Sequence, residues 1–424
     1  RNKTFFFVNL QHTINPNATL FNQQNTLATP AMLNGDLSSI STPIIDPTTN
    51  QPFVGNIIPQ NRISSASKFL SSYLLTSPTG SLVQNVPVQH NVWDGTMRLD
   101  HAITSKQSIY GRWTVQNYLD TSVGYEPAAI QDTTLRQHNL GVNYNYALTP
   151  TILLTVSGGY IHSDFLSTAP GFTGKENLTD KAGIQGFPTT GRENFIGLPN
   201  VNISGYNGFS VPGFGTPERL WSYVKTIKSN LTVVRGGHTF GFGYEFDDDS
   251  VYGNHGSGNS RGTFGFNGQY TGNGFADYLL GLTSSSNRNY PLAPFGLDHS
   301  PYSGLYAQDS WKVTPNLTIT YGVRYERWWE RTLKAGNGST FDLTLGKAIA
   351  GLDSNGQVNL TQQPVAQYFG PATADLWVPA SKVGVPNGLF KGNGHIAPRA
   401  NLTWRPWANR DFVIRGGFGV YYST

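Results

Sequence analysis

Few residues in this chain have the type and spacing that catalysis requires. The segment Gly258-Asn-Ser-Arg-Gly262 matches the G-x-S-x-G pattern of a nucleophilic serine. That serine needs a buried strand before it and a helix after it. Here a loop rich in Gly, Asn and Ser precedes the serine, and a strand-like run from Thr263 follows it. We therefore expect a loop at this position, with no catalytic residue and no enzymatic activity.

Metal and cofactor sites have little support in the sequence. Glu245 and the run Asp247 to Asp249 form the densest acidic cluster, which would suit Ca²⁺ because hard cations prefer several oxygen ligands. The ligand spacing of a calcium-binding loop is absent, so a solvated loop mouth is the favoured interpretation. The nine His are scattered without an H-E-x-x-H motif, and there is no Cys and no phosphate-binding glycine loop. The sequence therefore predicts no metal and no cofactor.

Composition excludes several other classes of protein. Charged residues make up 13% of the chain, and aromatic residues also reach 13%. This charged share is low for a soluble protein, and the aromatic share is high for a disordered one. The net charge of +4 includes no basic run, which argues against a nucleic-acid partner. Abundant Gly, Tyr, Phe, Thr and Asn are typical of a chain of strands and turns.

Several segments alternate between apolar and polar residues with a period of two. In 238–246 every even position from Phe240 onward is aromatic, while Thr, Gly, Gly and Glu stand at the odd positions. The same alternation runs through 139–146, 317–325 and 412–422. Such strands have one apolar and one wet face. Their length of about 10–13 residues suits a tilted membrane strand better than a soluble β-sandwich.

Short and long connections alternate along the chain, which favours an all-β, antiparallel up-and-down transmembrane β-barrel. Bacterial barrels of this kind have short periplasmic turns and long extracellular loops, and loops as long as 166–219 and 331–395 are unusual inside a compact soluble domain. The predicted short turns are 104–106, 148–151, 235–238, 314–316 and 406–410. The predicted long loops are 119–134, 166–219, 251–259, 291–301 and 331–395.

This layout predicts about thirteen strands. They are expected near 4–14, 91–103, 107–118, 135–148, 151–163, 221–234, 238–250, 260–270, 283–291, 302–313, 317–330, 396–405 and 411–422. We expect 62–75 to contain a short helix in the first long loop, and 275–281 to form a short helical connector on the periplasmic side. Two aromatic girdles are expected, one near the short turns (Trp311, Trp404, Trp407) and one near the loop ends (Trp328, Trp329, Tyr421, Tyr422).

Several sequence segments resemble those of a known family of receptors. They are Arg1-Asn-Lys-Thr-Phe-Phe-Phe-Val8, Ile57-Ile-Pro-Gln-Asn-Arg-Ile63, Met97-Arg-Leu-Asp-His101 with Ile109-Tyr-Gly-Arg-Trp113, the segment 267–281, and Tyr306-Ala-Gln-Asp-Ser-Trp-Lys-Val-Thr-Pro-Asn-Leu317. In this order, and over nearly the whole chain, they resemble the barrel of Oar-like TonB-dependent outer-membrane transporters of the acidobacterial type. The resemblance implies a barrel of about 22 strands, of which 1–424 is a part, with the plug and the N-terminal carboxypeptidase-regulatory-like domain outside this stretch.

From this resemblance we expect a receptor in the cell outer membrane that takes up a bulky nutrient. Its implied partners are outer-membrane lipid, an unknown extracellular ligand, and the TonB–ExbB–ExbD complex reached through the plug region. The alternative is a cell-surface adhesion or structural β protein whose long loops bind partners without transport. Substrate-binding residues stay unknown, because specificity would lie in the loops.

The expected topology makes three structural predictions. First, Phe240, Phe242, Tyr244 and Phe246 should face outward, and Gly241, Gly243 and Glu245 inward, because a charge facing lipid is costly. Second, 166–219 and 331–395 should lie on one side of the wall, opposite the short turns. Third, an odd number of strands leaves an open wall with edge strands near 4–14 and 411–422, which should not insert alone as a heat-resistant barrel.

Three charged residues are expected on the inward face, namely Arg324, Glu326 and Arg415. Their side chains would contact substrate or plug, or would pair with neighbouring charges inside the lumen. The sequence does not choose between these roles.

Overall fold

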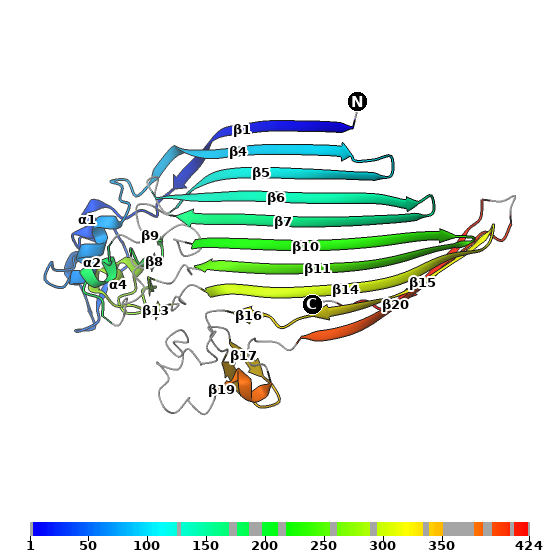
Figure 1. Ribbon diagram of the computed structural model, residues 1–424. Coiled ribbons are helices and arrows are strands. Elements are labelled where there is room, and N and C mark those ends of the chain that lie inside the picture. Colours follow the sequence, from blue (N-terminus) through cyan, green and yellow to red (C-terminus); the bar gives the residue numbers. More distant parts are fainter. Residues whose placement is uncertain are drawn as a thin grey trace.

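A computed structural model describes residues 3–124, 129–168, 176–185, 197–210, 218–254, 261–288, 295–333, 339–350, 377–384, 392–407 and 411–422. One large antiparallel sheet dominates it, with a folded unit at one end of the strands (Figure 1). The order of strands along this sheet is β1 (Thr4–Gln23), β4 (Leu82–Ala102), β5 (Gln107–Val123), β6 (Ile130–Thr149), β7 (Ile152–Thr168), β10 (Glu218–Arg235), β11 (His238–Asn254), β14 (Phe295–Thr314), β15 (Leu317–Trp328), β20 (Asn393–Trp404) and β21 (Ile414–Gly419).

The remaining elements are short. The helices are α1 (Pro30–Leu33), η1 (Val54–Asn56), α2 (Ser65–Leu70), η2 (Ser71–Tyr73), α3 (Leu178–Lys181), α4 (Gly274–Leu280) and η5 (Ala380–Val383). The strands are β2 (Ile45–Asp46), β3 (Gln51–Pro52), β8 (Asn200–Ile203), β9 (Tyr206–Phe209), β12 (Thr263–Phe266), β13 (Ser285–Asn287), β16 (Thr332–Leu333), β17 (Ser339–Asp342), β18 (Lys347–Ala350) and β19 (Trp377–Pro379). No helix in the described ranges has the length and hydropathy of a membrane span.

Tight turns join alternate pairs of long strands, as the sequence predicts. Pro150 and Thr151 connect β6 to β7, and Gly236 and Gly237 connect β10 to β11. Gly236 has a φ of 60°, a left-handed conformation that glycine adopts without the steric cost of a Cβ atom. These turns lie together at one end of the sheet (Figure 1), which we call the turn end.

The long connections lie at the opposite end, which we call the loop end. Each neighbouring pair along the sheet from β7 to β15 is antiparallel, so β7 and β15 run in the same direction. The connections that follow them, 169–217 and 329–392, therefore leave the sheet at the same rim. The predicted placement of the two longest loops opposite the short turns is confirmed.

Two of the predicted wall strands are wrong. The structure pairs β11 directly with β14, for example Phe240 with Asp309, so the described residues of 260–270 and 283–291 do not enter the wall. Their residues instead form β12 and β13 of a separate small sheet with β8 and β9. The alternation in 263–266 arises because Phe264 and Phe266 are buried in a local core, which gives the same period of two as a wall strand. The path contains eleven strands rather than thirteen.

The helical connector is confirmed as a helix but its predicted position is wrong. Asn273 accepts hydrogen bonds from the backbone N–H groups of Phe275 and Ala276 at the start of α4, and Gly281 ends the helix with a φ of 73°. Both are strong capping signals. The helix lies at the loop end, not the periplasmic turn end, because its apolar side chains are buried against residues from the other long loops.

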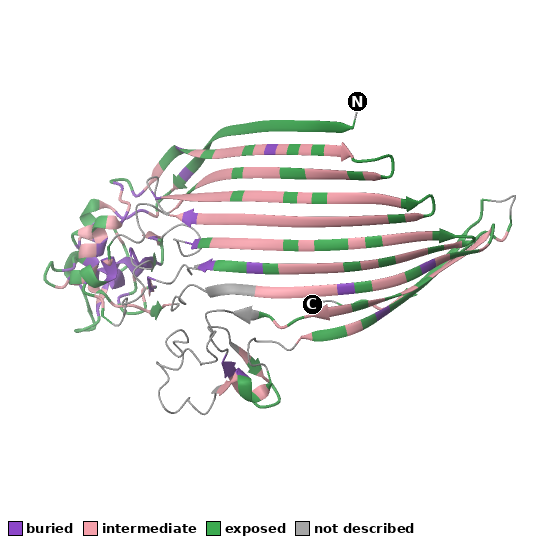
Figure 2. Cartoon of the chain, viewed as in Figure 1, coloured by how far each residue is buried: buried purple, intermediate pink, exposed green. Residues whose placement is uncertain are grey.

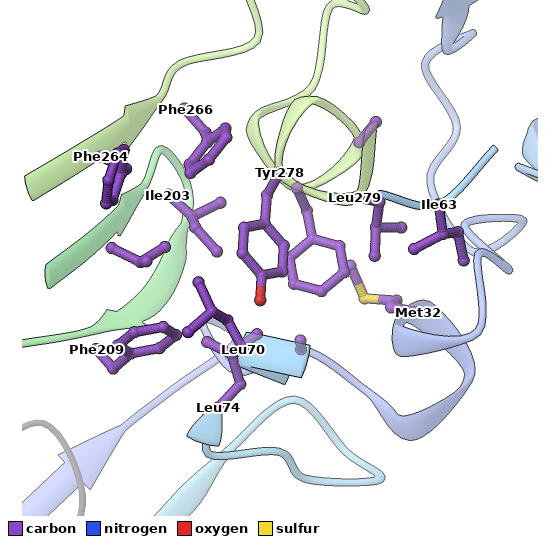
Figure 3. Packing of buried hydrophobic residues seen from close by; sticks show 14 of the residues in the cluster. Met32, Ile63, Leu70, Leu74, Ile203, Phe209, Phe264, Phe266, Tyr278 and Leu279 are labelled. Carbon is purple, nitrogen blue, oxygen red and sulfur yellow. The ribbon is translucent and has the colours of Figure 1, made fainter. Parts of the chain in front are cut away.

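Three long connections share one hydrophobic core. We call this unit the cap: the described residues within 24–81, 176–210 and 261–288. Tyr278 and Leu279 of α4 pack with Leu70 from the first connection and Phe209 from the second (Figure 3). Figure 2 shows that buried residues gather in this unit, whereas the long strands are half-buried or exposed along most of their length. The expected helix within 62–75 is confirmed as α2 and η2 of the cap.

Polar contacts lock the cap core. The Tyr278 hydroxyl donates to the Ser67 carbonyl oxygen at 3.2 Å, and the Ser67 hydroxyl donates to the Tyr278 carbonyl oxygen. Burial raises the pKa of the Tyr278 hydroxyl because the charged form is poorly solvated there. Asp277 is fully buried and accepts from the Thr271 N–H at 3.0 Å and from its hydroxyl at 2.7 Å. The cap is therefore one folded unit and not three independent loops.

The wall has two free edges among the described strands. The sheet order begins at β1 and ends at β21, and all but two residues of β1 are exposed. This arrangement agrees with the predicted open wall. Its edge strands are β1 and β21, which correspond to the predicted edges near 4–14 and 411–422.

Candidate functional site

The register of the wall divides its side chains into two faces of different chemistry. One continuous row of paired residues consists of Phe6, Leu99, Gly111, Val142, Gly158, Ile227 and Phe246. The row displaced by one residue consists of Asp100, Tyr110, Asn143, Ser157, Lys228, Glu245, Gly304 and Glu326. Successive residues of a strand point to opposite faces, so the first row lies on an apolar face and the second on a polar face.

The apolar face is exposed in the isolated chain. Phe6 is 81% exposed, and Leu99 and Ile227 are each 54% exposed. An apolar surface that continues across so many strands needs a cover, and lipid is the cover that suits a barrel wall. On β11, Phe240 and Phe242 lie on this face and Gly243 and Glu245 on the other, so the predicted alternation is confirmed.

Glycines on the polar face leave space that long side chains from neighbouring strands occupy. The Tyr306 ring on β14 crosses β11 at Gly243, and its hydroxyl donates to the Asn230 amide oxygen on β10 at 2.7 Å. A Cβ atom at Gly243 would lie 2.0 Å from the ring carbon Cε1 of Tyr306. Gly304 has the same role for Arg324, whose guanidinium nitrogen would lie 2.4 Å from such an atom. These side chains therefore lie along the wall instead of projecting from it.

Arg324 is the centre of an ion-pair network on the polar face. Its guanidinium donates to Glu245 on β11 at 2.7 Å and to Glu326 on its own strand at 2.8 Å. Lys228 on β10 forms a second ion pair with Glu245. The Tyr302 hydroxyl donates to Glu326 at 3.0 Å and accepts from Arg324 at 2.7 Å. For Arg324 and Glu326 the structure thus favours charge pairing over the other two roles that the sequence left open.

Arg98, Arg112 and Arg415 also lie on the polar face, and they differ in how firmly they are held. Arg98 pairs with Asp100 at 2.7 Å and lies over the Tyr110 ring at 4.0 Å. Arg112 stands opposite Arg98 on the neighbouring strand and is exposed, and within the described part of the chain it makes no ion pair. Arg415 on β21 also lies on the polar face, opposite Thr403, and it too lacks an ion pair among the described residues.

The other sequence candidates do not assemble into a reactive site. Gly258 to Ser260 of the serine pattern lie outside the described residues, and Arg261 next to them is buried in the cap, where desolvation lowers its pKa to about 10. Alternation along β11 splits the acidic run, because Asp248 pairs with His299 at 3.2 Å on the apolar face while Asp247 and Asp249 lie on the polar face. In the ranges that the structure describes, no group of three acidic or His side chains is placed to hold a metal.

Of the two predicted aromatic girdles, the one near the short turns is confirmed in part. Trp311 and Trp404 lie near the turn end on the apolar face. Trp328 is on the polar face, where its ring lies 5.2 Å from Tyr302, so it does not belong to a lipid-facing girdle. Trp329 comes one residue later, just beyond the end of β15.

Comparison with known proteins decides the family. The sequence profile described as outer membrane beta barrel domain matches residues 1–424. The chain belongs to the outer-membrane β-barrel domain family. Its location is therefore the outer membrane, its apolar face is the lipid-facing face, and its polar face lines the barrel interior.

Solved structures of transporters resemble this barrel domain at low identity. The outer membrane transporter YddB from Escherichia coli is 10% identical, with 80% of this chain and 33% of that chain covered and a TM-score of 0.42. The ferric-catecholate import receptor Fiu from E. coli K12 is 12% identical, with 78% and 45% covered and a TM-score of 0.37. The RagAB peptide importer is 9% identical, with 96% and 41% covered and a TM-score of 0.37. The chain thus spans less than half the length of each. A search of curated proteins found no match.

Sequence reasoning located Arg324 and Glu326 but missed the residues that complete their network. Lys228 and Tyr302 carry no motif, and their relation to Arg324 depends on the register between β10, β11, β14 and β15. The one signal in the sequence was the set of glycines at alternate positions, since Gly243 and Gly304 make room for the crossing side chains.

Proposed function

We propose that this barrel domain is the wall of an Oar-like, TonB-dependent receptor that imports a bulky nutrient. The observation that carries the proposal is the flat polar face. Barrels of about eight strands fill their interior with their own side chains, whereas much larger ones leave a channel or hold a plug. Here Tyr306 and Arg324 lie flat over Gly243 and Gly304, which is the arrangement that keeps a wide lumen clear.

The proposal gives each part of the molecule a role. The cap lies at the loop end, which faces the medium in barrels of this type, so it would meet the ligand first. Arg112 and Arg415 on the lumenal face, which make no ion pair with any described residue, would contact acidic groups of a plug or cargo. Coupling to TonB–ExbB–ExbD would pass through that plug, and the carboxypeptidase-regulatory-like domain would precede it.

An uptake experiment separates transport from adhesion. Cells that express the full gene product would receive a fluorescein-labelled tryptic digest whose peptides are too large for general porins. Surface-bound and internal fluorescence would be measured with and without a protonophore, which removes the energy that TonB transmits. Cells that lack the gene are the control.

Transport predicts internal fluorescence that depends on the gene and is abolished by the protonophore, while surface binding persists. Gene-dependent surface binding without any protonophore-sensitive internal signal would contradict the proposal and favour the adhesion alternative. To exclude a wrong choice of cargo, photo-crosslinking of the protein to TonB would be measured in the same cells. An absence of both crosslink and uptake would overturn the proposal.

A further inference from the structure

A groove opens on the lipid-facing side near the loop end, where β1, β4, β5 and β6 meet. Its volume is about 920 Å³. We call it the loop-end groove, and the residues that the argument uses are His12, Trp93, Asn117, Leu119, Arg136 and His138. All six belong to the apolar face. His12, Trp93, Asn117 and Arg136 are successive register partners across the sheet. Leu119 and His138 lie two residues from Asn117 and Arg136 on the same strands.

The groove combines aromatic surface with the positive charge of Arg136. His12 and Trp93 stack with ring centroids 3.7 Å apart, and His138 stacks with Trp113 at 6.0 Å. Arg136 is exposed and, within the described part of the chain, makes no ion pair. The nearby Asp164 is already held by Arg219, with contacts of 2.9 and 3.1 Å. The guanidinium of Arg136 is therefore available to an anion from outside the protein.

The position of the groove narrows the chemistry of that anion. Toward the turn end the same face continues as apolar residues, including Leu10, Met97 and Leu140. At the level of Arg136 and just beyond it toward the loop end, the face carries polar residues, among them Asp164 and Arg219. The groove thus lies at the level where lipid head groups meet acyl chains. A ligand that suits both parts of the groove needs a phosphate next to Arg136 and hydrocarbon chains on the turn-end side of that residue.

We propose that the loop-end groove binds a phosphorylated, multiply acylated glycolipid of the outer leaflet. A guanidinium forms bidentate, charge-assisted hydrogen bonds with phosphate, and His12 and Trp93 supply a flat surface for a sugar ring. A free phosphate would leave the aromatic surface uncovered, so the glycolipid is the occupant that the groove fits. The inference depends on the outer-membrane location and not on transport.

The test measures binding of a fluorescent, bis-phosphorylated lipid A to the purified protein in detergent micelles by anisotropy. The Arg136→Gln variant should bind about tenfold more weakly, the loss expected for one charge-assisted hydrogen-bonding group. Arg112→Gln is the matched control, because Arg112 is also an exposed arginine without an ion pair in the described ranges but lies on the lumenal face of the adjacent strand. Its affinity should equal that of the wild type.

Further arms distinguish the source of the phosphate and protect the test against misfolding. Removing the phosphates from lipid A should weaken its binding to the wild-type protein as much as the Arg136→Gln substitution weakens the binding of intact lipid A. Millimolar pyrophosphate should not displace the fluorescent lipid A. Asn117→Glu places a negative charge beside Arg136 at an exposed position, so it should weaken binding even if Arg136→Gln fails to fold. Equal losses for Arg112→Gln and Arg136→Gln, unchanged binding in Asn117→Glu, or displacement by pyrophosphate would overturn the proposal.

Discussion

Replacing Gly243 with alanine should disturb the polar face far more than its size suggests. The added methyl group would lie 2.0 Å from Cε1 of Tyr306, so the ring must leave its position. Its hydroxyl would then lose the 2.7 Å hydrogen bond to Asn230. One substitution on β11 would therefore break the link that Tyr306 makes from β14 to β10.

The expected cost follows from three effects. Overpacking a well-fitted contact costs about 1–3 kcal/mol, and the lost hydrogen bond adds about 0.5–1.5 kcal/mol. The lower entropy of an unfolded chain with alanine in place of glycine returns about 0.4–1 kcal/mol. We expect a net destabilisation of about 2 kcal/mol, since the hydrogen bond is exposed and its contribution falls at the low end.

The assay is urea unfolding of the purified full gene product in micelles, followed by tryptophan fluorescence. Gly141→Ala is the matched control, because Gly141 is also a strand glycine on the polar face but a Cβ added to it would meet no atom within 4 Å. It should be neutral or slightly stabilising. In a Tyr306→Ala background, Gly243→Ala should cost little. Equal effects at Gly141 and Gly243, or an undiminished cost without the Tyr306 ring, would refute the reasoning.

Other substitutions test other parts of the structure. His238→Ala should destabilise the protein by about 2 kcal/mol, because Asp309, which His238 contacts at 2.7 Å, is buried. Urea unfolding measures this loss of stability. An effect below about 0.5 kcal/mol would contradict a stabilising contact between His238 and Asp309. Leu279→Ala should lower the stability of the cap by about 2–5 kcal/mol and should expose all three connections to protease together. Cleavage confined to 261–288 would contradict a shared core. Hydrogen bonds from Arg62 lower the pKa of Asp46 below 3.8, so their pairing stabilises the cap above that pH and is lost as pH falls through the lower folded value. Arg62→Gln should therefore weaken protease resistance at pH 7 and flatten its acid dependence, and an unchanged pH profile would contradict the pairing.

The faces of the wall could be predicted from the sequence because the period of two is a local property. The alternation around Phe242 and Gly243 identifies both faces without any knowledge of partners. The same local signal failed at Phe264 and Phe266, because a short strand in a small core alternates in the same way. Periodicity alone does not show whether lipid or a protein core covers the apolar face of a strand.

The cap could not be predicted because its contacts join distant parts of the chain. The hydroxyl of Tyr278 contacts Ser67, 211 residues earlier, and neither residue belongs to a motif that indicates the other. The ion-pair network of the polar face could not be predicted for the same reason. Alternation placed Arg324 on the inward side, but its partner Glu245 lies 79 residues earlier, and only the register of β11, β14 and β15 brings the two together.

The central claim is that one face of this wall contacts lipid and the other lines a wet lumen. Because the chain contains no Cys, single cysteines at each position of 139–146 on β6 can be labelled in intact outer membranes with a charged maleimide. We expect labelling at the odd positions, such as Asn143, and protection at the even positions, such as Val142, with a strict period of two. Labelling of the even positions by the charged reagent, or labelling without that period, would contradict the account.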